Sequence, residues 1–145
     1  MPNDLSFELH ALTARLDRSA DRILLAELGV SYRRFRTLLI VSDLGTATQR
    51  ALAEKLGVSD PSVSRMTAVL VESGLIAVEP DPAGGNRRQV SLTVRGKDVV
   101  EQGRDVLEER FAGLVARSGV PYAEYARHTR RLMAALDEAE QEAAR

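Results

Sequence analysis

The sequence predicts a mainly α-helical fold that is interrupted once by a small β-hairpin. Apolar residues recur every three or four positions over most of the 145 residues, which is the period of an amphipathic helix. Glycines follow the ends of these periodic stretches, where helices commonly close in a left-handed conformation. Near residue 80 the period changes to alternation around a turn rich in proline and glycine, which is typical of a hairpin.

Four helices are expected before the hairpin. The first covers roughly residues 5–28, and its apolar stripe consists of Leu5, Leu9, Leu12, Leu16 and Ile23. Ser31 can cap a second helix, and the inner side of that helix would carry Phe35, Leu38, Leu39 and Ser42. Thr48 can cap a short third helix, Gln49 to Leu56, and Ser59 can cap the fourth.

The hairpin and two further helices complete the chain. Two short β-type runs, residues 75–79 and 89–92, flank the turn, so a two-stranded antiparallel hairpin is predicted. After Thr93 the helical period returns for one long helix, and Pro121 opens the last helix. The tail of that helix, residues 137–145, is rich in alanine and glutamate, and we expect it to fray.

Composition excludes several classes of protein. The length fits one domain, and 44% hydrophobic residues are enough for a core. Without cysteine there is no disulfide and no thiolate metal site. Every uncharged apolar run is far below the ~20 residues that cross a bilayer, and the acidic N-terminus is not a secretory signal. We therefore expect a cytoplasmic protein that does not insert into membranes.

Catalytic and metal-binding motifs are not found in the sequence. His10 and His128 are the only histidines, which is too few for a zinc or nickel site in a chain without cysteine. The sequence has no glycine-rich phosphate loop and no nucleophile elbow. We therefore predict no enzyme activity, no metal and no cofactor.

The third and fourth helices have the spacing of a helix-turn-helix, because only three residues, including Gly57, separate them. The hairpin follows directly, so the predicted fold is a winged helix-turn-helix. The outer face of the fourth helix carries small side chains, those of Ser62, Ser64 and Ala68. Its backbone can therefore approach the floor of a DNA major groove, where Arg65 can bond two acceptors of a guanine.

The hairpin tip adds a second basic feature. Arg87 and Arg88 lie beside its glycines. Arginines on such a tip can reach a minor groove, whose negative potential attracts them. The starts of the two short helices offer free backbone N–H groups that can hold phosphates. These features together point to double-stranded DNA as the partner.

Five segments in fixed order carry a family resemblance: Thr48–Ser59, Pro61–Met66, Leu70–Ile76, Asn86–Arg88 and Val90–Gly96. Together they resemble the MarR family of bacterial transcription regulators. The resemblance implies a homodimer that binds a palindromic operator, with a small-molecule effector that loosens the grip on DNA. It further implies a single domain over 1–145, in which 30–96 form the DNA-binding lobe and 1–29 and 97–145 form the dimerisation helices.

The resemblance also assigns the contacts to DNA. The residues implied are Thr48, Gln49, Ser59, Pro61, Ser62, Ser64, Arg65, Asn86, Arg87 and Arg88. Thr48 and Gln49 would lie near phosphates, and Arg88 would be the wing arginine with Arg87 beside it. Asn86 departs from the family pattern, which usually has an aspartate that holds the wing arginine. An asparagine brings no charge, so a looser wing is expected.

Net charge leaves two functions open. The chain carries −1 overall, with six basic against five acidic residues in the segment 46–95 and −2 in the last fifty residues. The leading hypothesis is a ligand-responsive repressor that touches DNA through a small basic face, with steep salt dependence and weak non-specific affinity. The alternative is a winged-helix protein-interaction module without DNA binding. The sequence selects no particular ligand.

Overall fold

The computed structural model describes residues 3–85 and 87–145 of the chain. It divides into two compact units, the first ending at Asp105 and the second beginning at Val106. Six helices and a small antiparallel sheet make up the described part, so the predicted mainly α-helical winged helix-turn-helix class is confirmed. The assignment of 30–96 to DNA binding and of 1–29 and 97–145 to dimerisation stays a prediction.

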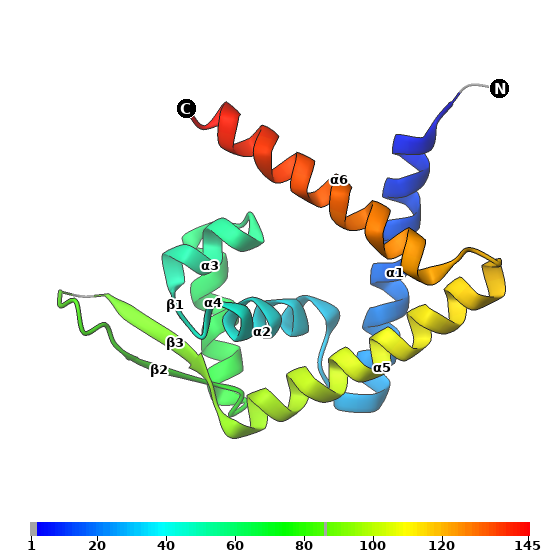
Figure 1. The fold of residues 1–145 in the computed structure, drawn as a ribbon. Helices are drawn as coiled ribbons and strands as arrows, with labels where there is room; N and C mark the ends of the chain where they lie inside the picture. Colours follow the sequence, from blue (N-terminus) through cyan, green and yellow to red (C-terminus); the bar gives the residue numbers. More distant parts are fainter. Residues whose placement is uncertain (1–2, 86) are drawn as a thin grey trace. The chain divides into compact units, whose positions relative to one another are not determined.

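The first unit contains most of the elements (Figure 1). In chain order these are α1 (Leu5–Leu28), α2 (Tyr32–Leu44), β1 (Thr46–Thr48), α3 (Gln49–Leu56), α4 (Asp60–Glu72), β2 (Ile76–Pro80) and β3 (Arg88–Leu92). The long helix α5 (Val94–Ser118) begins in this unit and continues into the second. The second unit is completed by α6 (Tyr122–Ala143).

The sheet has three strands instead of the two that were predicted. Its order is β1-β3-β2, and both pairs are antiparallel. Val90 of β3 pairs with Val78 on one side and with Ala47 on the other. The run Thr46–Thr48 is too short to show strand alternation in the sequence, but pairing with β3 and burial of Ala47 make it a strand.

The side-chain caps predicted for α2, α3 and α4 are found in the structure. The hydroxyls of Ser31, Thr48 and Ser59 each accept a hydrogen bond from the backbone N–H three residues on, which satisfies a donor that the helix leaves unpaired. Gly29 ends α1 with a left-handed φ of 68°. Asp4 stands at the N-cap position of α1, but its side chain makes no capping bond.

The core of the first unit joins helices and sheet. Its most deeply buried side chains are Leu24, Phe35, Leu38, Val41, Leu52, Val63, Leu70 and Val90. The expectation for α2 is therefore correct for Phe35 and Leu38. Leu39 and Ser42 are only half-buried, because Thr37 and Val41 take the inward positions beside them.

One side-chain contact fixes the start of α2 against α1. The Asp21 carboxylate accepts the backbone N–H of Tyr32 at 2.8 Å, so α1 supplies a partner for a donor that α2 leaves open. Burial raises the pKa of the Tyr32 hydroxyl above its ordinary value, and nearby Asp17 raises it further while Arg36 lowers it.

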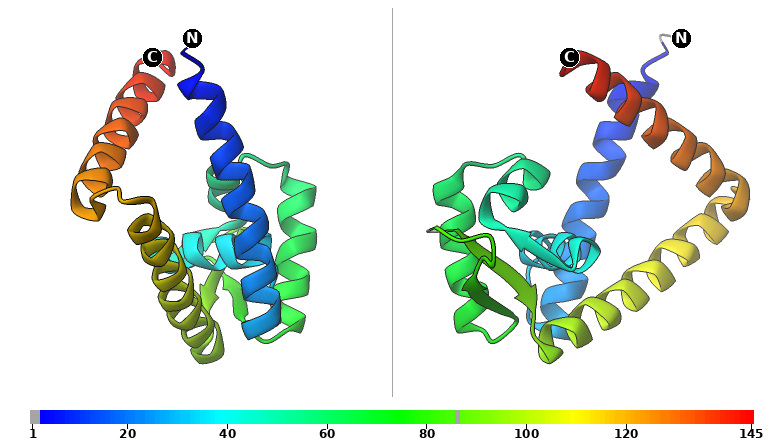
Figure 2. Two further views of the ribbon diagram at one scale, coloured as in Figure 1. Left: turned by 90° about the vertical axis from the view of Figure 1, so that its right-hand side faces the viewer. Right: turned by 60° about the vertical axis from the view of Figure 1, so that its left-hand side comes forward.

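The second unit consists of the end of α5 and α6. The rings of Phe111 and Tyr122 meet edge to face with centroids 6.4 Å apart, and the Tyr122 hydroxyl donates to the Glu108 carboxylate. Helix α6 is one unbroken helix (Figure 2). It continues to Ala143, so the tail that was expected to fray is helical except at its end. Within residues 3–85 and 87–145, no helix is long and apolar enough to span a membrane.

Candidate nucleic-acid interface

Helices α3 and α4 form a helix-turn-helix. Gly57 ends α3 with a φ of 66°, and its N–H contacts the carbonyls of Ala53 and Glu54. Only two more residues separate it from α4, whose first turn contains Pro61. Pro61 is tolerated there because the first turn of a helix leaves its N–H groups unpaired. The turn therefore closes over three residues, as the sequence predicts.

Helix α4 has one buried and one exposed face. Val63, Thr67 and Leu70 are at most 2% exposed and anchor the helix in the core. Ser64, Arg65 and Ala68 are exposed on the other side, and Ser62 is half-buried between them. Two of the exposed side chains are small, so the outer face can approach a partner closely.

The wing is organised by Asp81, an aspartate that the sequence analysis did not single out. The Asp81 carboxylate accepts the backbone N–H of Ala83 at 3.0 Å and the side-chain amide of Gln89 at 3.1 Å. Its own backbone N–H donates to the carbonyl of Arg87 at 2.9 Å. Asp81 therefore holds both sides of the tip together. Asn86 lies outside the described residues, so its expected effect on the wing stays a prediction.

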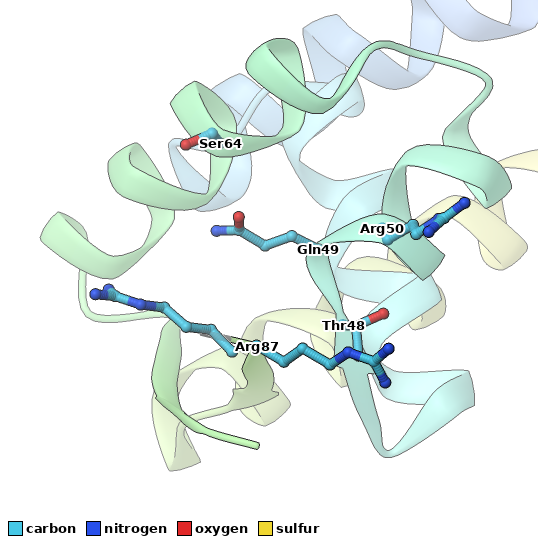
Figure 3. Close-up of a pocket in the computed structure, with 6 residues that line it drawn as sticks. Thr48, Gln49, Arg50, Ser64 and Arg87 are labelled. Carbon is cyan, nitrogen blue, oxygen red and sulfur yellow. The ribbon is translucent and has the colours of Figure 1, made fainter. Parts of the chain in front are cut away.

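A concavity of about 670 Å³ brings five of the predicted site residues together (Figure 3). Its described lining consists of Thr48, Gln49, Arg50, Ser64, Arg87 and Arg88. We call it the wing-side concavity, because it lies between the start of α3, the outer side of α4 and the wing. In Figure 3, Gln49 and Arg50 leave the start of α3 in opposite directions, so the lining reaches around the end of that helix.

Strand β1 explains why residues far apart in sequence meet here. Thr48 pairs with Gln89 in the sheet, which fixes the start of α3 beside the base of the wing tip. Arg87 and Arg88 directly precede Gln89 and are therefore held next to Thr48 and Gln49. Sequence reasoning did not predict this strand and so could not predict the proximity.

The wing-side concavity is basic. Three of its lining residues are arginines, and no described lining residue is acidic. Arg50, which sequence reasoning missed, pairs with Glu54 at 3.8 Å, but both side chains are about three-quarters or more exposed. An exposed pair of this kind is weak, so Arg50 can exchange Glu54 for another anion. The sequence signal that could have identified Arg50 was its position in the first turn of α3, two residues after the capping Thr48.

The other predicted site residues lie elsewhere. Ser62 and Arg65 line a different concavity on the opposite flank of α4, where the Arg65 guanidinium donates to the Ser62 hydroxyl at 3.4 Å. Ser59 caps α4 and its hydroxyl bonds that of Ser62 at 3.0 Å. Pro61 is exposed in the first turn of α4. In the part of the chain that the structure describes, no three His, Cys, Asp or Glu residues gather as a metal site.

Sequence comparison relates part of the chain to known proteins. The model of the MarR family matches residues 28–85. An uncharacterized HTH-type transcriptional regulator of Mycobacterium leprae is 31% identical over 80 residues, which cover 55% of this chain and 56% of the relative. The chain thus matches little more than half the length of that relative. A second, from Mycobacterium bovis, is 29% identical over 107 residues, 74% of this chain and 75% of the relative.

Solved structures share the fold over nearly the whole chain. A mutant of MarR from Escherichia coli superposes with a TM-score of 0.78 at 22% identity, covering 91% of this chain and 96% of that one. The same mutant complexed with operator DNA gives 0.76 at 22% identity over 92% and 94% of the two chains. A helix-turn-helix followed directly by an antiparallel wing makes this a winged helix-turn-helix protein. Together with the sequence matches, this fold supports a MarR-family winged-helix regulator.

Proposed function

We propose that this protein is a repressor that binds a palindromic operator as a homodimer and releases it when a small-molecule effector binds. The DNA-binding part of this proposal rests on the wing-side concavity. Three arginines and the polar side chains of Thr48, Gln49 and Ser64 line it. Arginine, hydroxyl and amide groups are the usual donors to phosphates and base edges. Operator DNA in the complex of Escherichia coli MarR supports the choice of partner by analogy.

In this proposal α4 lies in the major groove with its exposed face toward the bases. Ser62, Ser64 and Arg65 read base edges, while Thr48, Gln49 and Arg50 hold phosphates at the groove edge. Arg87 and Arg88 of the wing contact the DNA backbone or the minor groove, and Asn86 precedes them in the sequence. Ser59 and Pro61 set the start of α4, where free N–H groups face a phosphate.

Dimerisation is supported by exposed apolar side chains at both ends of the chain. Leu5 and Phe7 of α1 are 56% and 73% exposed, and Leu132, Met133 and Leu136 of α6 are exposed to a similar degree. None of the residues of α6 is buried within the single chain. Exposed apolar side chains in such number usually mark an interface, and a second copy of the chain would cover them in a symmetric dimer.

The test is a fluorescence-anisotropy titration of the full chain with a duplex that it selects from a random-sequence pool, beside a scrambled duplex. We expect tighter binding to the selected duplex and a steep loss of affinity with salt for both. If no salt-dependent binding is seen even at low ionic strength, the chain is instead a winged-helix interaction module.

Removal of both wing arginines should flatten the salt dependence of binding. In Arg87→Ala/Arg88→Ala the slope of log K against log salt should fall by about 0.9 for each phosphate that the wing no longer binds. The matched control, Arg95→Ala/Lys97→Ala, removes two exposed charges from the first turn of α5 and should keep the slope. Equal slopes for the two double variants would show that the wing does not touch DNA.

Arg65→Ala should cost specificity as well as affinity. Without a bidentate bond to guanine, binding to the selected duplex should weaken by about 1–3 kcal/mol, and base preference should relax at one position of each half-site. Arg50→Ala is the comparison, because an arginine that binds only phosphate should matter equally for all duplexes. Competition against duplexes with single base changes measures both. A uniform loss of affinity in Arg65→Ala would contradict its base-reading role.

A further inference from the structure

A second concavity lies on the other flank of α4. It has a volume of about 550 Å³, and its described lining consists of Leu25, Ser31, Arg33, Arg34, Ser62, Arg65, Met66 and Val69. These residues come from α1, from the start of α2 and from α4, all within the first unit. We call it the α2-side concavity. No sequence motif indicates a role for Arg33 or Arg34.

The α2-side concavity is basic and has hydroxyl groups at its rim. Arg33, Arg34 and Arg65 are exposed or nearly so, and no described lining residue is acidic. Neither Arg33 nor Arg34 forms a salt bridge with another described residue. Two long cationic side chains without a protein counterion, both lining one concavity, form a surface that suits a polyanion.

Helix geometry places the two concavities on either side of the exposed face of α4. An α-helix advances by about 100° per residue. Ser62 and Val69 therefore lie on one flank of the face that carries Arg65 and Ala68, and Ser64 lies on the other. The first flank lines the α2-side concavity, and the second lines the wing-side concavity. Arg65 stands at the border between the exposed face and the α2 side.

The two strands of DNA provide the matching geometry. A helix in the major groove, which is about 12 Å wide, has a sugar-phosphate backbone on each side of it. If the wing-side concavity holds one backbone, the other backbone passes along the α2-side flank. Arginine side chains are long enough to meet it without moving α4.

We propose that Arg33 and Arg34 bind phosphates of the DNA strand that borders the major groove on the side away from the wing. This inference rests on the proposed function and extends it, because α4 is then held between two backbones by two sets of arginines. The contacts carry no sequence information but fix the depth and register of α4, which is what phosphate contacts do in such complexes.

The test compares the full-length wild type with Arg33→Gln/Arg34→Gln on the selected and scrambled duplexes, between about 50 and 200 mM salt. We expect the slope of log K against log salt to fall by about 0.9 for each phosphate no longer neutralised, and so by up to about 3.6 for the four arginines of a dimer. Affinity should fall for both duplexes by the same factor, because the base contacts remain. Both side chains point to solvent, so the thermal unfolding curve should not change.

Arg36→Gln is the matched control. It removes the same charge from the same helix, but Arg36 does not line the α2-side concavity; its charge lowers the pKa of the Tyr32 hydroxyl instead. Its salt slope should fall by less than half as much as that of Arg34→Gln alone. Phosphate-ethylation interference then locates the contacts. The double variant should lose interference on one strand of each half-site, while interference from the wing side remains.

Different results would overturn the proposed function and the proposed role of Arg33 and Arg34. If the wild type shows no salt-dependent binding to any duplex, the proposed function itself is wrong. If the wild type binds but Arg33→Gln/Arg34→Gln keeps its slope and its full interference pattern, only the role of Arg33 and Arg34 is overturned. A weakening restricted to the selected duplex would also overturn it, because that outcome indicates base contacts.

Discussion

Replacing Leu132 and Leu136 by aspartate is expected to convert the proposed homodimer into monomers and to weaken binding to a two-half-site operator by about 10²–10⁴-fold. The two side chains lie one turn apart on α6 and are 65% and 59% exposed in the single chain. Charged groups at the centre of an apolar interface lose their hydration without gaining partners. Each monomer then binds its half-site independently, and the gain from linking two sites disappears. Light scattering and anisotropy measure the two effects.

The control places the same charges on the opposite face of α6. Ala134→Asp/Gln141→Asp adds two exposed carboxylates about half a turn away from Leu132 and Leu136, so it reports any general repulsion of DNA. We expect it to remain a dimer with nearly wild-type affinity. On a duplex with one half-site, both double variants should bind like the wild type. A Leu132→Asp/Leu136→Asp variant that still scatters as a dimer would contradict the assignment of α6 to the interface.

Local signals in the sequence predicted most of the fold. Ser31, Thr48 and Ser59 cap the helices that were assigned to them, since a side-chain oxygen just before a helix accepts a backbone N–H that its first turn leaves unpaired. Gly29 and Gly57 take the left-handed conformation that ends a helix. Each of these signals depends on a few neighbouring residues, and for that reason a single sequence contains them.

Features that depend on distant residues were not predictable. Strand β1 exists because Ala47 pairs with Val90, far along the chain, and so short a run cannot show a period. The same pairing brings Thr48 next to the wing. Likewise, Arg33 and Arg34 look like an ordinary solvated helix start until α4 is packed against α2. The candidate site was therefore predicted as a set of residues, but its division between two flanks of α4 was not.

The role of Asp81 was missed although a local signal existed. It stands in the run Pro80-Asp81-Pro82, and aspartate in such a context commonly accepts a backbone N–H two residues on. The structure has this bond, from Ala83. The family pattern instead directs attention to Asn86, at the other end of the turn. Asp81 also accepts from Gln89 across the hairpin, which no local pattern indicates.

Gly96→Ala should destabilise the protein, although alanine favours a helix over glycine by about 1 kcal/mol. Gly96 lies in the first turn of α5, where a Cβ would overlap the backbone carbonyl of Leu75. The same carbonyl accepts the N–H of Thr93, while the Thr93 hydroxyl donates to the carbonyl of Gly74 and accepts the N–H of Gly96. Relief of the overlap would break this joint between the wing and α5. We expect a net loss of about 1–3 kcal/mol, measured by chemical denaturation.

Gly113→Ala is the matched control for Gly96→Ala, because the two variants should change the free energy of unfolding in opposite directions. It is the same substitution in the same helix, but a Cβ at Gly113 meets no heavy atom within 4 Å. Helix propensity alone should therefore act there, and we expect the free energy of unfolding to rise by up to about 1 kcal/mol. Opposite signs for the two variants would show that close approach of α5 to Leu75, and not flexibility of the helix, requires glycine at position 96. If Gly96→Ala were as stable as Gly113→Ala, α5 would have to begin farther from β2 than the structure has it.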